Sequence, residues 1–204
     1  MMNALNARHV AVVLAVVLGS ASAAVPASRP LANMVTGNVT SQPIGHYEFC
    51  QRHPDECNIR FTSTPPAKVT AYGWQMIHEV NESVNHRITA KTDMEVYGKE
   101  EYWEYPVDAG DCEDYVLEKR KELSEKGFSL ADLLITVVRK PDGEGHAVLT
   151  VRTSEGDFIL DNLTDDVNLW TATPYTYLKR QATFNTGRWV TIEDGRDILV
   201  GALR

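Results

Sequence analysis

Three residues have the types and the order that acyl transfer by a thiol requires: Cys112, His146 and Asp161. A thiol attacks a carbonyl carbon efficiently only as a thiolate, so it needs a base, and the imidazole that serves as base needs a group to orient it. Taken singly, the three have ordinary alternatives as a small buried side chain, a strand-end histidine and a turn carboxylate. Their order and their places in the predicted elements favour nucleophile, base and orienting carboxylate.

The candidate nucleophile is predicted at the first turn of a helix. Gly110 and Asp111 precede it, Asp being a favoured N-cap residue, and Gly127 would end the helix. The unpaired N–H groups and the dipole at a helix start stabilise a thiolate, and the same N–H groups could bind an oxyanion. Glu113 and Asp114 oppose this, because nearby negative charge raises the pKa of a thiol. A reactive thiolate here therefore needs a cationic partner.

The base and the orienting carboxylate are predicted on neighbouring strands. Residues 133–139, 146–152 and 158–160 are apolar or β-branched and are separated by short Gly- and Asp-containing turns. His146 begins the second of these strands and Asp161 follows the third, so an antiparallel meander brings the two residues together. The meander should pack against the helix of the nucleophile, which predicts an α+β fold.

A further helix is predicted upstream, within residues 65–88. Apolar residues recur there at intervals of mostly three and four, as one buried helical face requires, and they include Ile77, Val80 and Val84. The segment 91–106 is polar and aromatic and is predicted to be extended.

The first 23 residues have the pattern of a cleaved secretory signal. An apolar run at 10–18 follows a charged start and precedes an Ala-x-Ala site ending at Ala23. The alternative is an uncleaved anchor, but the run is shorter than the ~20 residues needed to span a bilayer. Residues 24–42 are rich in Ala, Pro, Ser and Thr and predict a flexible arm. Residues 43–204 then form one domain.

Composition narrows the function classes. The chain has 204 residues, of which 43% are hydrophobic and 24% charged, so a disordered or collagen-like protein is excluded. The formal net charge of −8 argues against a nucleic-acid binder, which needs a basic face. No later stretch is long and apolar enough for a membrane span. We therefore expect no nucleic acid as partner and no membrane insertion after signal cleavage.

Cys50 and Cys57 lie seven positions apart, and an exported protein would favour a disulfide between them. A zinc site with His46 and His53 is the alternative, although the spacing matches none of the usual zinc patterns. The pairing would leave Cys112 as the one free thiol.

Three short blocks carry a resemblance to a known family. The blocks are Gly-Asp-Cys-Glu-Asp-Tyr at 110–115, Gly-His-Ala-Val-Leu at 145–149 and Leu-Asp-Asn-Leu at 160–163. With them, the chain resembles the bacterial transglutaminase-like cysteine peptidases over about residues 70–189. The resemblance implies a papain/transglutaminase-like α+β core. It also assigns the catalytic roles to Cys112, His146 and Asp161.

The resemblance further implies a calcium ion bound beside the nucleophile. Members of the family bind calcium through acidic residues that resemble Asp111, Glu113 and Asp114 here. Clustered oxygen ligands suit this hard cation, and its charge would offset the acidic surroundings of the thiol. The alternative is that these residues only cap the helix and complement its dipole.

The activity implied is that of a periplasmic cysteine endopeptidase. Family members cut cell-surface adhesins and are sequestered by an inner-membrane receptor, so an adhesin substrate and such a regulatory receptor are expected partners. The same three residues would also serve a transamidating acyltransferase. A non-catalytic module that binds a peptide or a protein in its cleft is the second alternative.

Overall fold

The structure is a computed structural model and describes residues 32–62 and 65–194, so the predicted signal peptide lies outside the described residues. The helices are α1 (Ile44–Arg52), α2 (Pro54–Cys57), α3 (Ala71–Arg87), α4 (Asp93–Tyr97), α5 (Cys112–Glu125) and the 3₁₀ turn η1 (Trp170–Ala172). The strands are β1 (Thr36–Thr40), β2 (Thr89–Ala90), β3 (Ala109–Gly110), β4 (Leu133–Arg139), β5 (Gly145–Thr153), β6 (Gly156–Asp161), β7 (Thr164–Leu169), β8 (Thr176–Ala182) and β9 (Asn185–Ile192).

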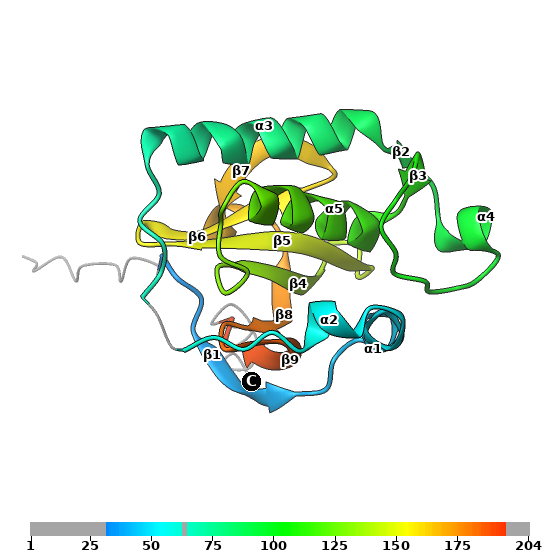
Figure 1. The fold of residues 1–204 in the computed structure, drawn as a ribbon, viewed down its shortest axis with the longest axis horizontal. Coiled ribbons are helices and arrows are strands. Elements are labelled where there is room, and N and C mark those ends of the chain that lie inside the picture. The colour runs from blue at the N-terminus through cyan, green and yellow to red at the C-terminus, as the bar shows by residue number, and fades with distance from the viewer. Residues whose placement is uncertain (1–31, 63–64, 195–204) are drawn as a thin grey trace, which may run out of the picture.

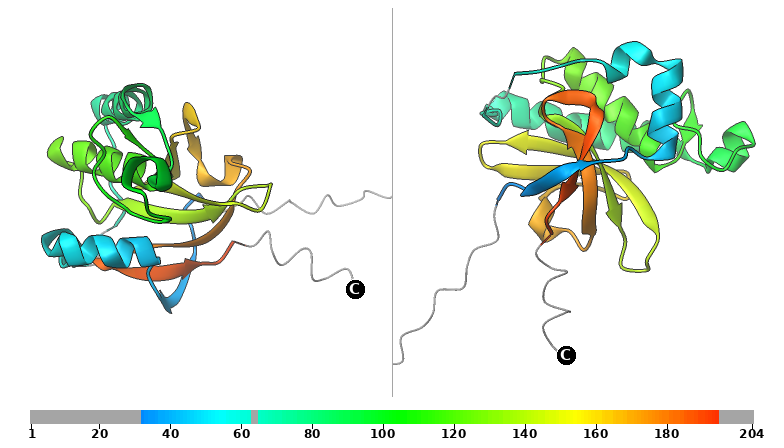
Figure 2. Two further views of the ribbon diagram at one scale, coloured as in Figure 1. Left: turned by 90° about the vertical axis from the view of Figure 1, so that its right-hand side faces the viewer. Right: turned by 90° about the horizontal axis from the view of Figure 1, so that it is seen from below.

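Seven of the strands form one antiparallel sheet in the order β1-β9-β8-β4-β5-β6-β7. The predicted meander is its β4-β5-β6 portion, and the predicted strand 133–139 is reproduced in full as β4. Helices α3 and α5 lie side by side over one face of the sheet (Figure 1). Figure 2 shows the helices from two further sides. The α+β fold class is confirmed.

Most of the apolar core lies between the helices and the sheet. Helix α3 contributes Ile77, Val80 and Val84, which are the residues that its spacing predicts, and β5 contributes alternate residues such as Leu149. Alternation is expected because successive strand residues point to opposite faces. A second cluster that includes Val148 and Tyr177 is built around the other residues of the strands. The two clusters give the sheet an apolar layer on each face.

The predicted arm differs from the structure. Thr36–Thr40 falls inside the range 24–42, yet it forms the edge strand β1 and pairs with β9 through Val39 and Val190. Its sequence alternates poorly, because an edge strand of this kind buries little on either face. The sheet therefore begins before residue 43. The extended segment predicted at 91–106 also contains a short helix, α4, which begins with a capping box at Thr92.

The disulfide prediction is confirmed. Cys50 and Cys57 are joined, with their Cα atoms 5.6 Å apart, and the bond links α1 to α2. Because both thiols are used, the zinc alternative loses its sulfur ligands. His46 instead lies in the core, where its Nδ1 accepts a hydrogen bond from the indole of Trp189 at 3.2 Å. No helix among the described residues is long and apolar enough to cross a membrane.

Candidate active site

Cys112 is the first residue of α5, as predicted, and Asp111 occupies the N-cap position. The Asp111 side chain makes no capping hydrogen bond to its own helix, and its Oδ2 accepts the backbone N–H of Asp93 at 3.3 Å. The N–H groups of the first turn are thus left without a side-chain cap. Such a helix start can receive an anion or an oxyanion.

His146 and Asp161 meet as the meander predicts. His146 Nε2 lies 2.8 Å from Asp161 Oδ1, and both side chains are buried. An ionised carboxylate can only accept, so Nε2 carries the proton and donates it. In the neutral imidazole this leaves the lone pair on Nδ1, which is then the nitrogen available as a base.

Asp161 accepts two more hydrogen bonds. The hydroxyl of Tyr175 donates to Oδ2 at 2.5 Å, and the N–H of Leu163 donates to Oδ1 at 3.0 Å. Burial opposes ionisation of Asp161, but the bonds from His146, Tyr175 and the Leu163 N–H hold its pKa below the usual range. The tyrosine ring also packs edge-on against the imidazole, with centroids 5.6 Å apart. Asp161 is thus a fixed anion behind His146.

The sulfur of Cys112 lies beside the strand of the histidine. The backbone N–H of Ala147, the residue after His146, hydrogen-bonds this sulfur. The thiol also lies 3.0 Å from Glu113 Oε2 and donates to it. Burial and the negative charge of Glu113 raise the pKa of Cys112, while the Ala147 N–H lowers it. In this arrangement the sulfur is a protonated thiol.

Three carboxylates gather next to the thiol, from Asp93, Asp111 and Glu113, with an oxygen of each within 4.8 Å of the others. Within the described residues, Oδ1 of Asp93 and Oδ1 of Asp111 are buried without a hydrogen-bond partner. Burial and the Asp111 charge raise the pKa of Glu113 to about 9. Oxygen-only groups crowded in this way suit a hard cation.

The sequence predicts Asp111 and Glu113 in this group but not Asp93, which lies 18 positions before Asp111. Asp93 begins helix α4, which is packed against the nucleophile segment through β3. Asp114, the third predicted ligand, lies outside the group. Its Oδ1 accepts the N–H of Glu104 at 2.9 Å, and burial raises its pKa to about 8, with the charges of Asp111 and Asp93 adding to the rise.

The loop closed by the disulfide fixes the segment that precedes the nucleophile. Arg52 Nε and His53 Nε2 lie 3.4 Å and 2.8 Å from carboxylate oxygens of Glu104. The Glu104 backbone in turn donates to Asp114, as described above. The N–H of the neighbouring Tyr102 donates to Oδ2 of Asp93. The disulfide loop is thereby linked, through this segment, to the carboxylates beside the thiol.

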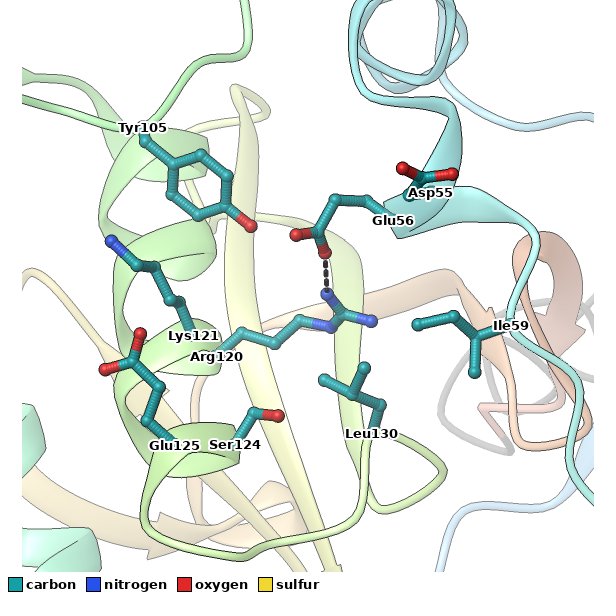
Figure 3. A pocket seen from close by; sticks show the side chains of 9 residues that line it. All are labelled: Asp55, Glu56, Ile59, Tyr105, Arg120, Lys121, Ser124, Glu125 and Leu130. Atoms are coloured by element: carbon teal, nitrogen blue, oxygen red, sulfur yellow. Dashed lines mark ion pairs between the residues drawn. The ribbon is translucent and has the colours of Figure 1, made fainter.

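Further along α5 the disulfide loop borders a cavity of about 330 Å³, shown in Figure 3. Arg120 and Glu56 face each other across it at 3.5 Å, and Tyr105 hydrogen-bonds the same glutamate. Arg120 lies two helical turns beyond Cys112, and Asp55 and Glu125 on the rim repel anions. The cavity lies between α2 and α5, and Cys112 does not line it.

The comparisons with known proteins agree with this architecture. The family model described as the bacterial transglutaminase-like cysteine proteinase matches residues 36–197 of the chain. The matched range begins at β1 and includes every element of the sheet. No match is found among curated proteins.

Solved structures of one protein from Legionella pneumophila are similar to the chain. Calcium-bound LapG is 23% identical, with a TM-score of 0.50, and the alignment covers 64% of this chain and 80% of that one. LapG treated with EGTA is 24% identical with a TM-score of 0.49, covering 64% and 79%. At 23% identity, the similarity to calcium-bound LapG supports the assignment of the fold.

Proposed function

The chain belongs to the bacterial transglutaminase-like cysteine proteinases, and from this premise we propose that Cys112, His146 and Asp161 hydrolyse peptide bonds as a catalytic triad. The observation that carries the proposal is the hydrogen bond from His146 Nε2 to Asp161. It fixes the imidazole in the tautomer whose Nδ1 is free to act as a base. His146 lies at the start of β5, where the backbone N–H of the next residue, Ala147, hydrogen-bonds the nucleophilic sulfur.

Acylation then proceeds in two steps. The Cys112 thiol transfers its proton to His146 Nδ1, and the sulfur attacks the carbonyl carbon of the scissile peptide bond. The uncapped N–H groups at the start of α5 stabilise the resulting oxyanion. When the C–N bond breaks, His146 gives the proton to the leaving amine, and a thioester on Cys112 remains. Asp161 stabilises the imidazolium throughout and keeps it oriented.

Deacylation uses the same groups in reverse. His146 accepts a proton from a water molecule, the hydroxide oxygen attacks the thioester carbon, and the C–S bond breaks. The thiolate recovers the proton from His146, and the product leaves with a new carboxyl group. A primary amine in place of water would give transamidation by the same steps.

Asp93, Asp111 and Glu113 fit a calcium ion, and we propose that they bind it. The fit rests on their clustered oxygens and on the unpartnered Oδ1 atoms of Asp93 and Asp111. A bound cation would offset the negative charge beside Cys112 and so favour its thiolate. The similarity to a calcium-bound LapG structure agrees with this proposal.

We further propose that the enzyme acts in the periplasm on a protein of the cell surface, such as an adhesin. The basis is the signal-like pattern of residues 1–23, which would direct export before cleavage. A disulfide between Cys50 and Cys57 also suits an oxidising compartment. Control by an inner-membrane receptor is part of the same proposal.

Proteomics of cell-envelope fragments tests the hydrolytic function. Wild-type cells should release fragments that are missing from cells carrying Cys112→Ala, with one new carboxyl terminus at a consistent site. Ser154, which is exposed in the turn between β5 and β6, offers the matched control as Ser154→Ala. Identical fragment sets in wild type and Cys112→Ala would contradict proteolysis.

Two further measurements address the alternatives. A fluorescent primary amine added with the substrate would be incorporated by a transamidase and ignored by a strict hydrolase. Alkylation by iodoacetamide reports on Cys112 alone, because the other two cysteines form the disulfide. The triad predicts rapid alkylation at neutral pH that His146→Ala slows, whereas a non-catalytic module predicts a rate like that of free cysteine in both proteins.

A further inference from the structure

Asp161, the orienting carboxylate, lies at a turn at the edge of the sheet, where strand pairing alone holds the chain weakly. Asp161 ends β6 and pairs with Thr164, so Asn162 and Leu163 form the tight turn into β7. Strand β7 is the edge of the sheet, and Leu163 is largely exposed. A turn at a sheet edge is free to shift unless other groups hold it. A shift would move Asp161 and, with it, the imidazole of His146.

Two asparagines of α3 reach this turn. Asn81 and Asn85 are four positions apart and so share one helical face. The Asn85 amide donates to the backbone oxygen of Asp161 at 3.0 Å and to that of Thr164 at 3.0 Å. It also lies 2.9 Å from Oδ1 of Asp165. The Asn81 amide donates to the backbone oxygens of Thr164 and Asp165 at 3.2 Å and 3.0 Å.

Asn81 is placed where packing alone would favour an apolar residue. Asn81 is fully buried between α3 and the sheet, next to Val80 and one turn from Ile77 and Val84. Burying an amide is unfavourable unless it forms hydrogen bonds. Within the described residues, the Oδ1 atoms of both asparagines have no partner. The hydrogen bonds from the two NH₂ groups to the turn are therefore the interactions that offset the cost of burying these amides.

We propose that Asn85, supported by Asn81, is a positioning residue for the Asp161–His146 pair; this inference rests on the triad proposed above. The amide of Asn85 donates hydrogen bonds to the two residues that begin and end the β6–β7 turn, so it fixes the position of the turn relative to α3. With the turn fixed, the carboxylate of Asp161 stays within hydrogen-bond distance of His146 Nε2. Asn85 itself touches neither the sulfur nor the reacting carbonyl.

The test compares Asn85→Asp with Asn85→Ala. Aspartate has the shape of asparagine but presents an acceptor to three acceptors, so it should disturb the turn more than alanine does. The readout is the His146 Nε2–H proton in the ¹H NMR spectrum, which the short bond to Asp161 places downfield of the amide signals. We expect this resonance to persist in the wild type, to weaken in Asn85→Ala and to vanish in Asn85→Asp.

The iodoacetamide rate of Cys112 should fall in the same order, by about tenfold in Asn85→Ala, which is the size of effect expected from losing the hydrogen bond to the Asp161 backbone. Gln75→Ala is the matched control, since Gln75 is exposed on the same helix. Asn85→Ser, which keeps one donor, should give an intermediate result if the aspartate variant does not fold.

Two outcomes separate this inference from the triad itself. If Asn85→Asp keeps both the downfield resonance and the alkylation rate of the wild type, the positioning role is wrong and the asparagine only fills space. If His146→Ala leaves the alkylation rate unchanged, the proposed triad fails first. Melting temperatures measured for every variant identify any that are simply unfolded.

Discussion

The hydroxyl of Tyr175 lies 2.5 Å from Oδ2 of Asp161 and donates a hydrogen bond to it. Because His146 uses the other carboxylate oxygen, Asp161 is held from both sides. The tyrosine ring also contacts the edge of the imidazole. Tyr175 thus fixes two members of the proposed triad at once, and it is also a member of the second apolar cluster.

Tyr175→Phe should lower kcat/KM by about tenfold, because it removes one hydrogen bond to a buried carboxylate and keeps the ring contact.

In the same variant the pKa of Asp161 should rise toward its usual range. On acidification, the stability of Tyr175→Phe should therefore begin to decline at a higher pH than that of the wild type. Acid titrations followed by circular dichroism would detect this shift. Tyr72→Phe, at an exposed position of α3, is the control. Equal acid midpoints in wild type and Tyr175→Phe would show that the hydroxyl contributes nothing to ionisation.

Calcium should stabilise the protein, and EGTA should lower its melting temperature. Binding at 100 times Kd contributes about 2.7 kcal/mol to the free energy of unfolding. Asp93→Asn should weaken calcium binding in isothermal titration calorimetry as strongly as Asp111→Asn does, because both carboxylates belong to the group. Asp108→Asn, which changes an exposed residue, is the control.

A calcium affinity that Asp93→Asn leaves unchanged would place the ion elsewhere. Asp114→Asn distinguishes the ligands predicted from the sequence, which include Asp114, from the group in the structure, which has Asp93 in its place. If the group of Asp93, Asp111 and Glu113 holds the ion, this variant should affect folding, through the bond to Glu104, more than calcium affinity.

Lys119 should make stability depend on pH. It is fully buried on α5, and burial lowers its pKa to about 7, although the charges of Asp161 and Asp165 act in the opposite direction. Its pKa is therefore higher in the unfolded chain, which binds more protons between about pH 7 and the usual lysine range. This residue's contribution to stability should rise with pH across that window.

Lys119→Met should therefore be more stable than the wild type below pH 7, by more than about 1 kcal/mol, with the difference shrinking as the pH rises toward 10. Urea unfolding at several pH values measures it. Lys121→Met, at a half-exposed position of the same helix, should show no such trend. A pH-independent difference for Lys119→Met would mean that its ammonium group stays charged on folding.

Loss of the disulfide should lower the free energy of unfolding. Closing a loop of this size contributes about 2–3 kcal/mol in the chain-entropy description. The double variant Cys50→Ala/Cys57→Ala should unfold at lower urea concentration than the wild type, and a reducing agent should shift only the wild type. Calcium affinity should fall as well, since Arg52 and His53 hold the segment around Glu104. Unchanged calcium affinity would show that this segment keeps its place without the loop.

Some parts of the site could be predicted because neighbours in the chain decide them. The place of Cys112 at a helix start follows from Gly110 and Asp111 just before it, and the approach of His146 to Asp161 follows from the short turns of the meander. The disulfide joins residues only seven positions apart. In each case local propensity and short connections leave few alternatives.

Other parts depend on packing between distant segments. Strand β1 exists because β9 offers it an open edge, and its own residues carry little strand pattern. Asp93, Tyr175 and Asn85 have no spacing relation to the residues that they serve. A buried polar residue on an apolar helix face reads from sequence as a break in the pattern, and its partner becomes visible only after folding.

The sequence by itself therefore determined the chemistry on offer, which is a free thiol at a helix start with an imidazole and a carboxylate on adjoining strands. The tertiary structure decided what surrounds those groups: the third carboxylate beside the thiol, the second donor to Asp161 and the amides that hold its turn. The physical reason is that hydrogen bonds and charge interactions act over a few ångströms, whatever the separation along the chain.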